Sequence, residues 1–407
     1  MTMIVRIRHA RMLDGLGNPA QDNVTIEVAE GHIAAITPDP GTALGPSDVD
    51  AAGRTVLPGF VNLHSHLLRR KRADDPATMT TVAEVVRALR NAREALAQGI
   101  TTARELGARD HLDLQLRDLI DAGGVPGPRI FASGRPITRT GGHNCDFSHE
   151  ADGPDEVRKA ARLELKAGAD VLKVMASWGG IETGLEHRRL RLPGDPAPAA
   201  AAYTIEEMRA AVEEAHAVGK RVTVHAESSQ SVLRAIAAGV DSIEHGTHLT
   251  GEAVRALAET RIPLVPTIST VFKRVADADR RVGVDWGSDV MSWARLATRP
   301  WMESLRRAIA AGVPIATGTD AGGDIATEIA LLVEAGLQPI EALRSATSLA
   351  AETLGRTDLG AVEAGRWADL VVVDGYPDVD LGALRAVRCV IKAGSPHDPQ
   401  ELLLGTG

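Results

Sequence analysis

The stretch that decides the fold is residues 56–67, VLPGFVNLHSHL, in which a short apolar run ends in His64 and His66. Residues two apart on a strand point to the same face, so both imidazoles are expected on one side of the strand's carboxyl end. From this run onward, short apolar segments alternate with longer amphipathic stretches such as 82–98 and 204–219. The apolar segments are residues 56–63, 100–105, 129–133, 170–175, 221–225, 242–245, 263–268 and 314–320.

Apolar segments that alternate with helical stretches are typical of an α/β protein with a parallel sheet. Eight such units in series, each too short to form its own core, predict a distorted (β/α)8 TIM barrel. An open doubly wound sheet is the alternative, and it usually carries a glycine-rich phosphate loop after its first strand. Here the first segment ends in His64-Ser65-His66 instead, which favours the barrel.

The two ends of the chain have a different pattern. Short β-type runs separated by turns occupy residues 4–7, 24–28 and 32–36, and similar runs return at 367–374 and 387–392. We therefore expect two domains. A small, discontinuous β-sandwich is predicted from residues 1–55 and 359–407, beside a TIM-barrel domain formed by residues 56–358.

Composition narrows the class of protein. The 407 residues are 44% hydrophobic and 24% charged, which excludes disorder as the main state. A net charge of −9 and 3% aromatic residues argue against a nucleic-acid or anionic-membrane partner. No apolar run is long enough to span a membrane, and no signal peptide is apparent. Two cysteines, Cys145 and Cys389, cannot form a disulfide framework, which favours a cytoplasmic protein. The partner that we expect is a small-molecule substrate. A homo-oligomer is the default expectation.

Residues able to bind a metal gather at the carboxyl ends of the predicted strands. Barrel enzymes place their reactive groups there, and neutral imidazole and carboxylate are good ligands for zinc. A single histidine in such a position is more often a packing residue, but the joint pattern favours a metal site. The candidate metal ligands are His64, His66, Lys173, His225, His245 and Asp320.

Lys173 lies within the apolar segment DVLKVMAS, residues 170–177. An ammonium group is costly to bury, and beside metal ions it would also be repelled. Reaction with CO2 converts a lysine into an anionic carbamate able to bridge two metals. Two Zn²⁺ ions then carry four positive charges, from which the carbamate, Asp320 and a hydroxide subtract three. The alternative is a lysine whose ammonium extends from the strand end to solvent.

The chain resembles the amidohydrolase superfamily, in its binuclear-zinc branch and its prolidase-like or imidazolonepropionase-like subgroup. The matching segments are VLPGFVNLHSHL, GITTAREL, GGHN, DVLKVMAS, VTVHAES, SIEHG, ATGTDAG, SATSLAAETLG and AVEAGRWADLVVVD. The resemblance implies two divalent metal ions, with zinc favoured over manganese, cobalt or iron. It assigns His64, His66 and Asp320 to the more buried ion, and His225 and His245 to the more exposed one. The carboxylated lysine would bridge them.

The resemblance also implies catalytic and substrate-binding residues. Asp320 would take a proton from the attacking hydroxide and pass it to the leaving group, and His143 would hydrogen-bond the substrate carbonyl. Tyr203 aligns with a substrate-contacting residue of prolidase-like members. Trp178 is expected either to wall the substrate pocket or to pack on the rim, within a long loop at 177–202; a second long loop is expected at 269–288.

The expected function is metal-dependent hydrolysis of an amide-type C–N bond in a peptide-like, N-acyl, lactam, carbamate or urea substrate. Prolidase-like relatives often carry a second histidine after VxxHA, where this chain has Glu227-Ser228, so a simple dipeptidase is in doubt. We expect Glu227 to be exposed, although the same position supplies a general acid in some relatives. A mononuclear deaminase usually lacks the lysine, and an inactive scaffold would have lost ligands.

Overall fold

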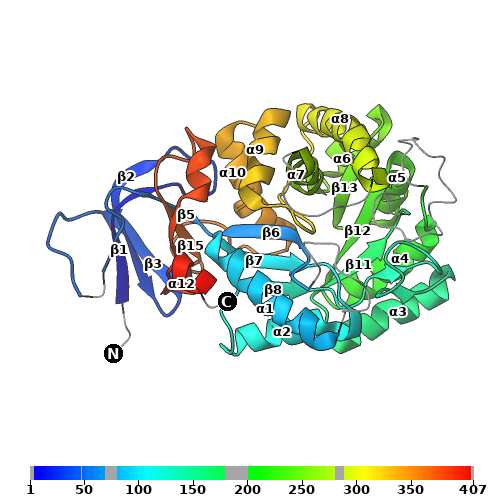
Figure 1. Cartoon of the computed structure of the whole chain (residues 1–407), viewed down its shortest axis with the longest axis horizontal. Coiled ribbons are helices and arrows are strands. Elements are labelled where there is room, and N and C mark those ends of the chain that lie inside the picture. Colours follow the sequence, from blue (N-terminus) through cyan, green and yellow to red (C-terminus); the bar gives the residue numbers. More distant parts are fainter. Residues whose placement is uncertain (1–3, 47, 69–79, 179–199, 280–287, 405–407) are drawn as a thin grey trace.

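The computed structural model describes residues 4–46, 48–68, 80–178, 200–279 and 288–404. Strands from both ends of the chain share one eight-stranded sheet, whose order is β17-β16-β15-β5-β1-β2-β3, with β4 paired to β1. Figure 1 shows β1, β2 and β3 at one end of the molecule. The strands of this sheet are β1 (Ile4–Met12), β2 (Gln21–Ala29), β3 (His32–Pro38), β4 (Val49–Asp50), β5 (Thr55–Pro58), β15 (Leu370–Val373), β16 (Val387–Lys392) and β17 (Ser395–His397).

The remaining strands form two parallel sheets. One has the order β10-β9-β11-β12-β13-β14, and the other has the order β6-β7-β8. Their strands are β6 (Phe60–Ser65), β7 (Ile100–Glu105), β8 (Arg129–Ala132), β9 (Ile137–Thr138), β10 (His149–Glu150), β11 (Val171–Met175), β12 (Arg221–Ser228), β13 (Ser242–His248) and β14 (Leu264–Val265). Parallel sheets with intervening helices confirm the predicted α/β class.

Helices follow most strands of the parallel sheets and surround them in Figure 1. They begin where the sequence provides caps: the Thr204 hydroxyl and the Glu207 carboxylate form a capping box at α4, and Ser228 and Ser231 do so at α5. The α-helices are α1 (Thr81–Ala97), α2 (Leu112–Asp121), α3 (Gly153–Ala167), α4 (Ile205–Ala217), α5 (Ser229–Ala238), α6 (Gly251–Thr260), α7 (Ile268–Asp279), α8 (Ser288–Ala310), α9 (Ile325–Ala335), α10 (Pro339–Ser345), α11 (Ser348–Thr353) and α12 (Pro399–Leu404). In the described part of the chain, none of them is both long and apolar enough to cross a bilayer.

The first predicted strand is interrupted at Gly59, so that β5 joins the chain-end sheet and β6 joins a parallel sheet. A Cβ atom at Gly59 would lie 2.1 Å from the Thr101 hydroxyl oxygen. Only glycine therefore allows the backbone to pass this close to β7. Gly59 alone therefore separates β5 of the chain-end sheet from β6, the strand that carries His64.

The predicted strand at residues 314–320 is wrong as a regular strand, because only Ile315 forms a bridge, to Leu264. The segment nevertheless lies between β14 and β6. The Ala316 amide donates to the Leu264 carbonyl at 2.9 Å, and the Leu63 amide donates to the Thr317 carbonyl at 2.9 Å. The predicted strand at 263–268 is also shortened to β14, because Pro266 has no amide hydrogen to continue the ladder.

The predicted loop at residues 269–288 is wrong in its first part, because residues 269–279 belong to helix α7. Residues 280–287 lie outside the described residues. The carboxylate of Glu328, on α9, accepts hydrogen bonds from the first two amides of α7, those of Ile268 at 3.1 Å and Ser269 at 2.7 Å. A cap from a distant helix leaves no local sequence signal. Of the other predicted loop, 177–202, residues 179–199 lie outside the described residues.

Candidate metal centre and active site

Three of the six candidate ligands form a compact group. The ligand atoms of His64, His66 and Asp320 all lie within 4.8 Å of one another. The Nε2 atoms of His66 and His64 are 3.4 Å and 3.9 Å from Oδ1 of Asp320. Two imidazoles and a carboxylate at this spacing are a donor set that fits a divalent ion such as zinc.

Backbone contacts fix Asp320 against β6. The amides of Thr319 and Asp320 both donate to the carbonyl of His64, at 3.2 Å and 2.8 Å. Asp320 has a φ of 54°, a left-handed conformation that aspartate tolerates better than most residues. The Ala321 amide donates to Oδ1 of Asp320 at 2.6 Å, so the turn orients the carboxylate as well as the backbone.

A buried carboxylate, that of Glu244 on β13, orients His64. His64 Nδ1 donates to it at 2.7 Å, and Arg104 forms an ion pair with it at 2.6 Å. Burial alone would raise the pKa of Glu244, but Arg104 and His64 together hold it below its usual range. An ionised Glu244 fixes the tautomer of His64 that leaves Nε2 on the side of Asp320. Arg104 and Glu244 thus form an ion pair that is buried in the protein interior.

His225 and His245 continue the cluster along β12 and β13. The His245 ring centroid lies 4.9 Å from that of His64 and 4.5 Å from that of His225. Nδ1 of His245 lies 2.7 Å from the hydroxyl of Thr267. Burial lowers the pKa of both His225 and His245 well below the usual value. Both imidazoles are therefore neutral at pH 7, which is the state a metal ligand needs.

Lys173, on β11, completes the set. Its side chain is 2% exposed. Burial lowers the pKa of His64, His225 and His245, and the charge of Lys173 lowers each of them further. Lys173 is paired with Thr223, two residues before His225, across β11 and β12. The fold thus brings His64, His66, Asp320, His225 and His245 together and places Lys173 on the strand next to β12, while their roles as metal ligands stay predictions.

The other predicted site residues differ in their placement. The His143 ring stacks on that of His225, with centroids 4.4 Å apart, so it lies at the cluster as expected. Trp178 is half-buried, and the guanidinium carbon of Arg139 lies over its ring, 4.7 Å from the ring centroid. Tyr203 is 1% exposed and donates its hydroxyl to the Ala151 carbonyl at 2.7 Å. The predicted contact between Tyr203 and substrate stays a prediction.

Sequence reasoning missed two residues that support the cluster and misjudged a third. Glu227 was expected to be exposed, but it is buried, with its carboxylate 3.8 Å from Nε2 of His225. Glu244 and Thr267 each contact a candidate ligand. The sequence did offer a signal for Glu244, because it is an acidic residue inside a predicted buried strand. A buried carboxylate needs a cationic partner, which here is Arg104.

Comparison with known proteins agrees with this geometry. The model of the amidohydrolase family matches residues 55–397. Ochratoxinase from Aspergillus niger is 30% identical over 336 residues, which are 75% of this chain and 66% of the relative, so the chain spans just under two thirds of it. Imidazolonepropionase from Salinispora tropica is 26% identical over 92% of both chains.

A solved structure of a Xaa-Pro dipeptidase with bound methionine superposes with a TM-score of 0.86. It is 31% identical, and the match covers 97% of this chain and 100% of the other. The chain therefore belongs to the amidohydrolase family and, within it, to a prolidase-like group.

Proposed function

We propose that this protein is a metal-dependent hydrolase that cleaves an amide-type C–N bond in a small-molecule substrate. The observation that carries the proposal is the compact group of His64, His66 and Asp320, with further ligand-capable side chains beside it. The substrate classes are those of the sequence prediction: peptide-like, N-acyl, lactam, carbamate or urea. The names of the relatives, which include a dipeptidase and an ochratoxinase, support this range.

We also propose that the two parallel sheets close into one distorted (β/α)8 barrel, with the chain-end sheet as a β-sandwich beside it. Backbone hydrogen bonds support closure at both junctions. The Leu63 amide donates to the Thr317 carbonyl, and the Asp170 amide donates to the Ala132 carbonyl at 2.8 Å. Closure places all the candidate ligands at one end of the barrel.

The donor set fits two divalent ions, and we propose zinc. His64, His66 and Asp320 would hold the more buried ion, and His225 and His245 the more exposed one. Lys173, as its carbamate, would bridge them, which removes the cost of a buried ammonium among three imidazoles. When bound, such ions lower the pKa of water towards about 7 and polarise a carbonyl group.

The side chains of this chain then perform the remaining chemistry. The Asp320 carboxylate accepts a proton from the attacking water and delivers it to the leaving nitrogen, whose protonation allows the C–N bond to break. The ring of His143, stacked on His225, donates a hydrogen bond to the carbonyl oxygen as negative charge develops there. Burial of this cluster excludes bulk water and strengthens both interactions.

Elemental analysis combined with a hydrolysis panel tests the proposal. The purified protein should contain two metal ions per chain and should hydrolyse at least one amide-type substrate. Asp320→Asn should abolish turnover, whereas His216→Asn, at an exposed histidine paired with Asp241, should not. One metal per chain with release of ammonia from a ring amine would indicate the mononuclear deaminase instead. A protein that binds no metal would contradict both.

A further inference from the structure

The loop that carries His143 is short for the connection that it makes. Residues 139–148 join β9 to β10, and these two strands are parallel neighbours. The chain must therefore return from the end of β9 to the start of β10, which usually takes about a dozen residues or more, most often with a helix. This shorter connection, which the structure describes in full, contains no helix. Its backbone carbonyls therefore need hydrogen-bond donors from outside the usual helical pattern.

Arg135, just before β9, supplies two of these donors. Its Nε atom donates to the Phe147 carbonyl at 3.2 Å, and its Nη2 atom donates to the Ser148 carbonyl at 2.5 Å. Phe147 and Ser148 lie just before β10, so the guanidinium joins the starts of the two strands. A planar guanidinium holds two neighbouring acceptors in a fixed geometry, which the single nitrogen of a lysine does less well.

The same two residues are bonded to the residue that follows His143. The amides of Phe147 and Ser148 donate to the Asn144 carbonyl at 3.3 Å and 3.1 Å. The carbonyls of these residues thus bond to Arg135 while their amides bond to Asn144. Two residues therefore link the guanidinium to the backbone next to His143, and a change at one end is transmitted to the other.

Two helices fix the backbone from which the Arg135 side chain extends. The Arg135 amide donates to the carboxylate of Glu164, on α3, at 3.0 Å. The Gly134 amide donates to the carboxylate of Asp113, on α2, at 2.7 Å. Both acidic residues are buried. The guanidinium is therefore held by the packed helices, whereas the carbonyls that it binds belong to the loop.

These bonds end at an ordered imidazole. His143 is buried, and its ring stacks on that of His225. A hydrogen-bond donor stabilises an oxyanion well only if its position is set before the charge develops. We propose that Arg135 is a positioning residue for His143, whose guanidinium holds the turn after His143 and thereby keeps the imidazole against His225. The inference rests on the proposed C–N hydrolase function and deepens it, because Arg135 then controls the rate through His143.

A double-mutant cycle between Arg135 and His143 tests this inference. Arg135→Ala should lower kcat by roughly 10- to 100-fold, the cost of a misplaced catalytic group, and should leave KM and metal content nearly unchanged. In a protein that already carries His143→Ala, the same substitution should lower kcat by less than about twofold, because no imidazole is left to misplace. Arg135→Lys, which keeps one cationic donor, should lose less activity than Arg135→Ala.

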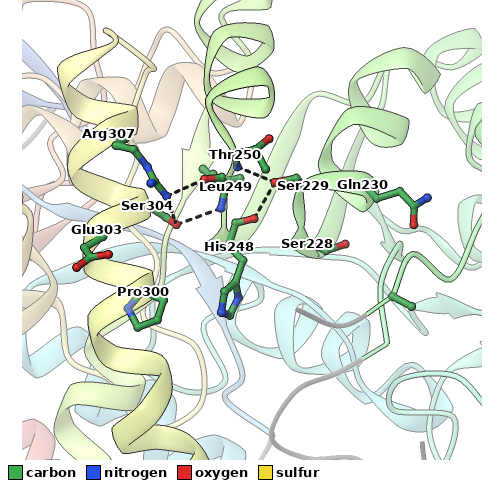
Figure 2. A pocket seen from close by; sticks show the side chains of 11 residues that line it. Ser228, Ser229, Gln230, His248, Leu249, Thr250, Pro300, Glu303, Ser304 and Arg307 are labelled. Carbon is green, nitrogen blue, oxygen red and sulfur yellow. Dashed lines mark hydrogen bonds between the residues drawn. The ribbon is translucent and has the colours of Figure 1, made fainter. Parts of the chain in front are cut away.

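Arg307→Ala is the matched control for the cycle. In the pocket of Figure 2, the Arg307 guanidinium on α8 donates to the Leu249 carbonyl at 2.8 Å. This arginine also holds a loop carbonyl, but in a loop that does not carry His143. Any change in kcat that Arg307→Ala causes should therefore be equal with and without the His143 imidazole.

Modification of histidines by diethyl pyrocarbonate, mapped by mass spectrometry, reports on His143 without any substrate. Arg135→Ala should increase the rate of modification at His143 about tenfold, because the loop opens more often once its carbonyls are released. Arg307→Ala should leave that rate unchanged. The exposed His216 provides the reference rate in each protein.

Equal losses of kcat for Arg135→Ala in the two backgrounds would overturn the positioning role, and so would an unchanged rate of modification at His143. Loss of metal from Arg135→Ala would also overturn it, because Arg135 would then support the entire cluster rather than His143. If Arg135→Ala does not fold, Arg135→Lys is carried through the same measurements. Faster modification of His143 in a protein that hydrolyses no amide would overturn the proposed function alone.

Discussion

Lys173 is the residue whose chemistry most depends on its surroundings. Its side chain is buried, and its charge lowers the pKa of His64, His225 and His245 beyond the effect of their own burial, so a cation is unfavourable there. We expect Lys173→Ala to lower both metal content and turnover by orders of magnitude, because the bridge between the metals is lost. Short carboxylic acids added to the buffer should restore part of the activity by occupying the same place.

Lys166→Ala, at an exposed position on α3, is the control for this experiment. Metal content is measured by elemental analysis, and turnover with the best substrate of the panel. A Lys173→Ala protein that retains two metal ions and a normal rate would exclude the carbamate.

Substitution of His143 should lower the rate without removing metal, unlike substitution of a metal ligand. Its ring stacks on His225, but its proposed partner is the substrate. His143→Ala should leave metal content nearly unchanged and lower kcat by about 10²–10³, the usual cost of losing one oxyanion donor. His216→Ala provides the comparison. An unchanged kcat would make His143 a structural residue, and loss of metal would make it a ligand.

Sequence alone could name the six candidate ligands because five of them lie at the ends of apolar segments and Lys173 lies inside one, and the parallel sheets align these segments. Their roles as ligands stay predictions. Sequence alone did not predict Glu244 and Thr267, whose contacts with His64 and His245 depend on which strands are neighbours. It misjudged Glu227 because β12 continues to Ser228, beyond the predicted end at residue 225, so Glu227 lies inside the strand and on the same face as His225.

At the scale of elements, the start of α7 depends on a single carboxylate from α9. Glu328 accepts the amide hydrogens of Ile268 and Ser269, and Thr267, the residue before them, contacts His245. The same carboxylate therefore fixes both a helix end and the backbone next to a candidate ligand. Sequence analysis placed a loop here because the cap comes from a residue 59 or 60 positions away.

This cap predicts a pH dependence of stability. Burial raises the pKa of Glu328 to about 7, whereas an unfolded glutamate has a pKa of about 4.3. Between these values the folded state retains a proton that the unfolded state has released. The free energy of unfolding should therefore fall as pH rises from about 4.5 to about 7, by roughly 2–4 kcal/mol, and this stabilisation is absent at higher pH.

Urea unfolding across this pH range measures the effect. Glu328→Gln cannot ionise, so its stability should lose this slope, even though the variant is less stable overall because an amide group replaces one acceptor. Glu334→Gln, on an exposed part of the same helix, should keep the slope. Parallel curves for Glu328→Gln and the unmodified protein would show that Glu328 stays ionised in the fold.

At the scale of the whole molecule, the chain-end sheet is joined to the parallel sheets by the chain itself and by shared side-chain packing. Strand β15 pairs with β5, which leads through Gly59 directly into β6 and its histidine. Side chains of β15 alternate between two cores: Val371 packs in the large cluster shared with the parallel sheets, and Val372 packs in the cluster of the chain-end sheet. The domain boundaries predicted at residues 55 and 359 stay predictions. Because both faces of the chain-end sheet are buried, separate unfolding of the parts on its two sides is unfavourable.

This arrangement predicts a single unfolding transition for the entire protein. Val371→Ala and Val372→Ala each remove buried methyl groups and should each cost roughly 1.5–3 kcal/mol. Because the two faces belong to one sheet, both variants should lower the midpoint of the same calorimetric transition, with loss of bound metal at that midpoint. Val379→Ala, at an exposed valine, should leave the midpoint unchanged. If Val372→Ala instead produces an early transition during which the metal remains bound, the chain-end sheet unfolds independently, and the histidines on β6 do not depend on it.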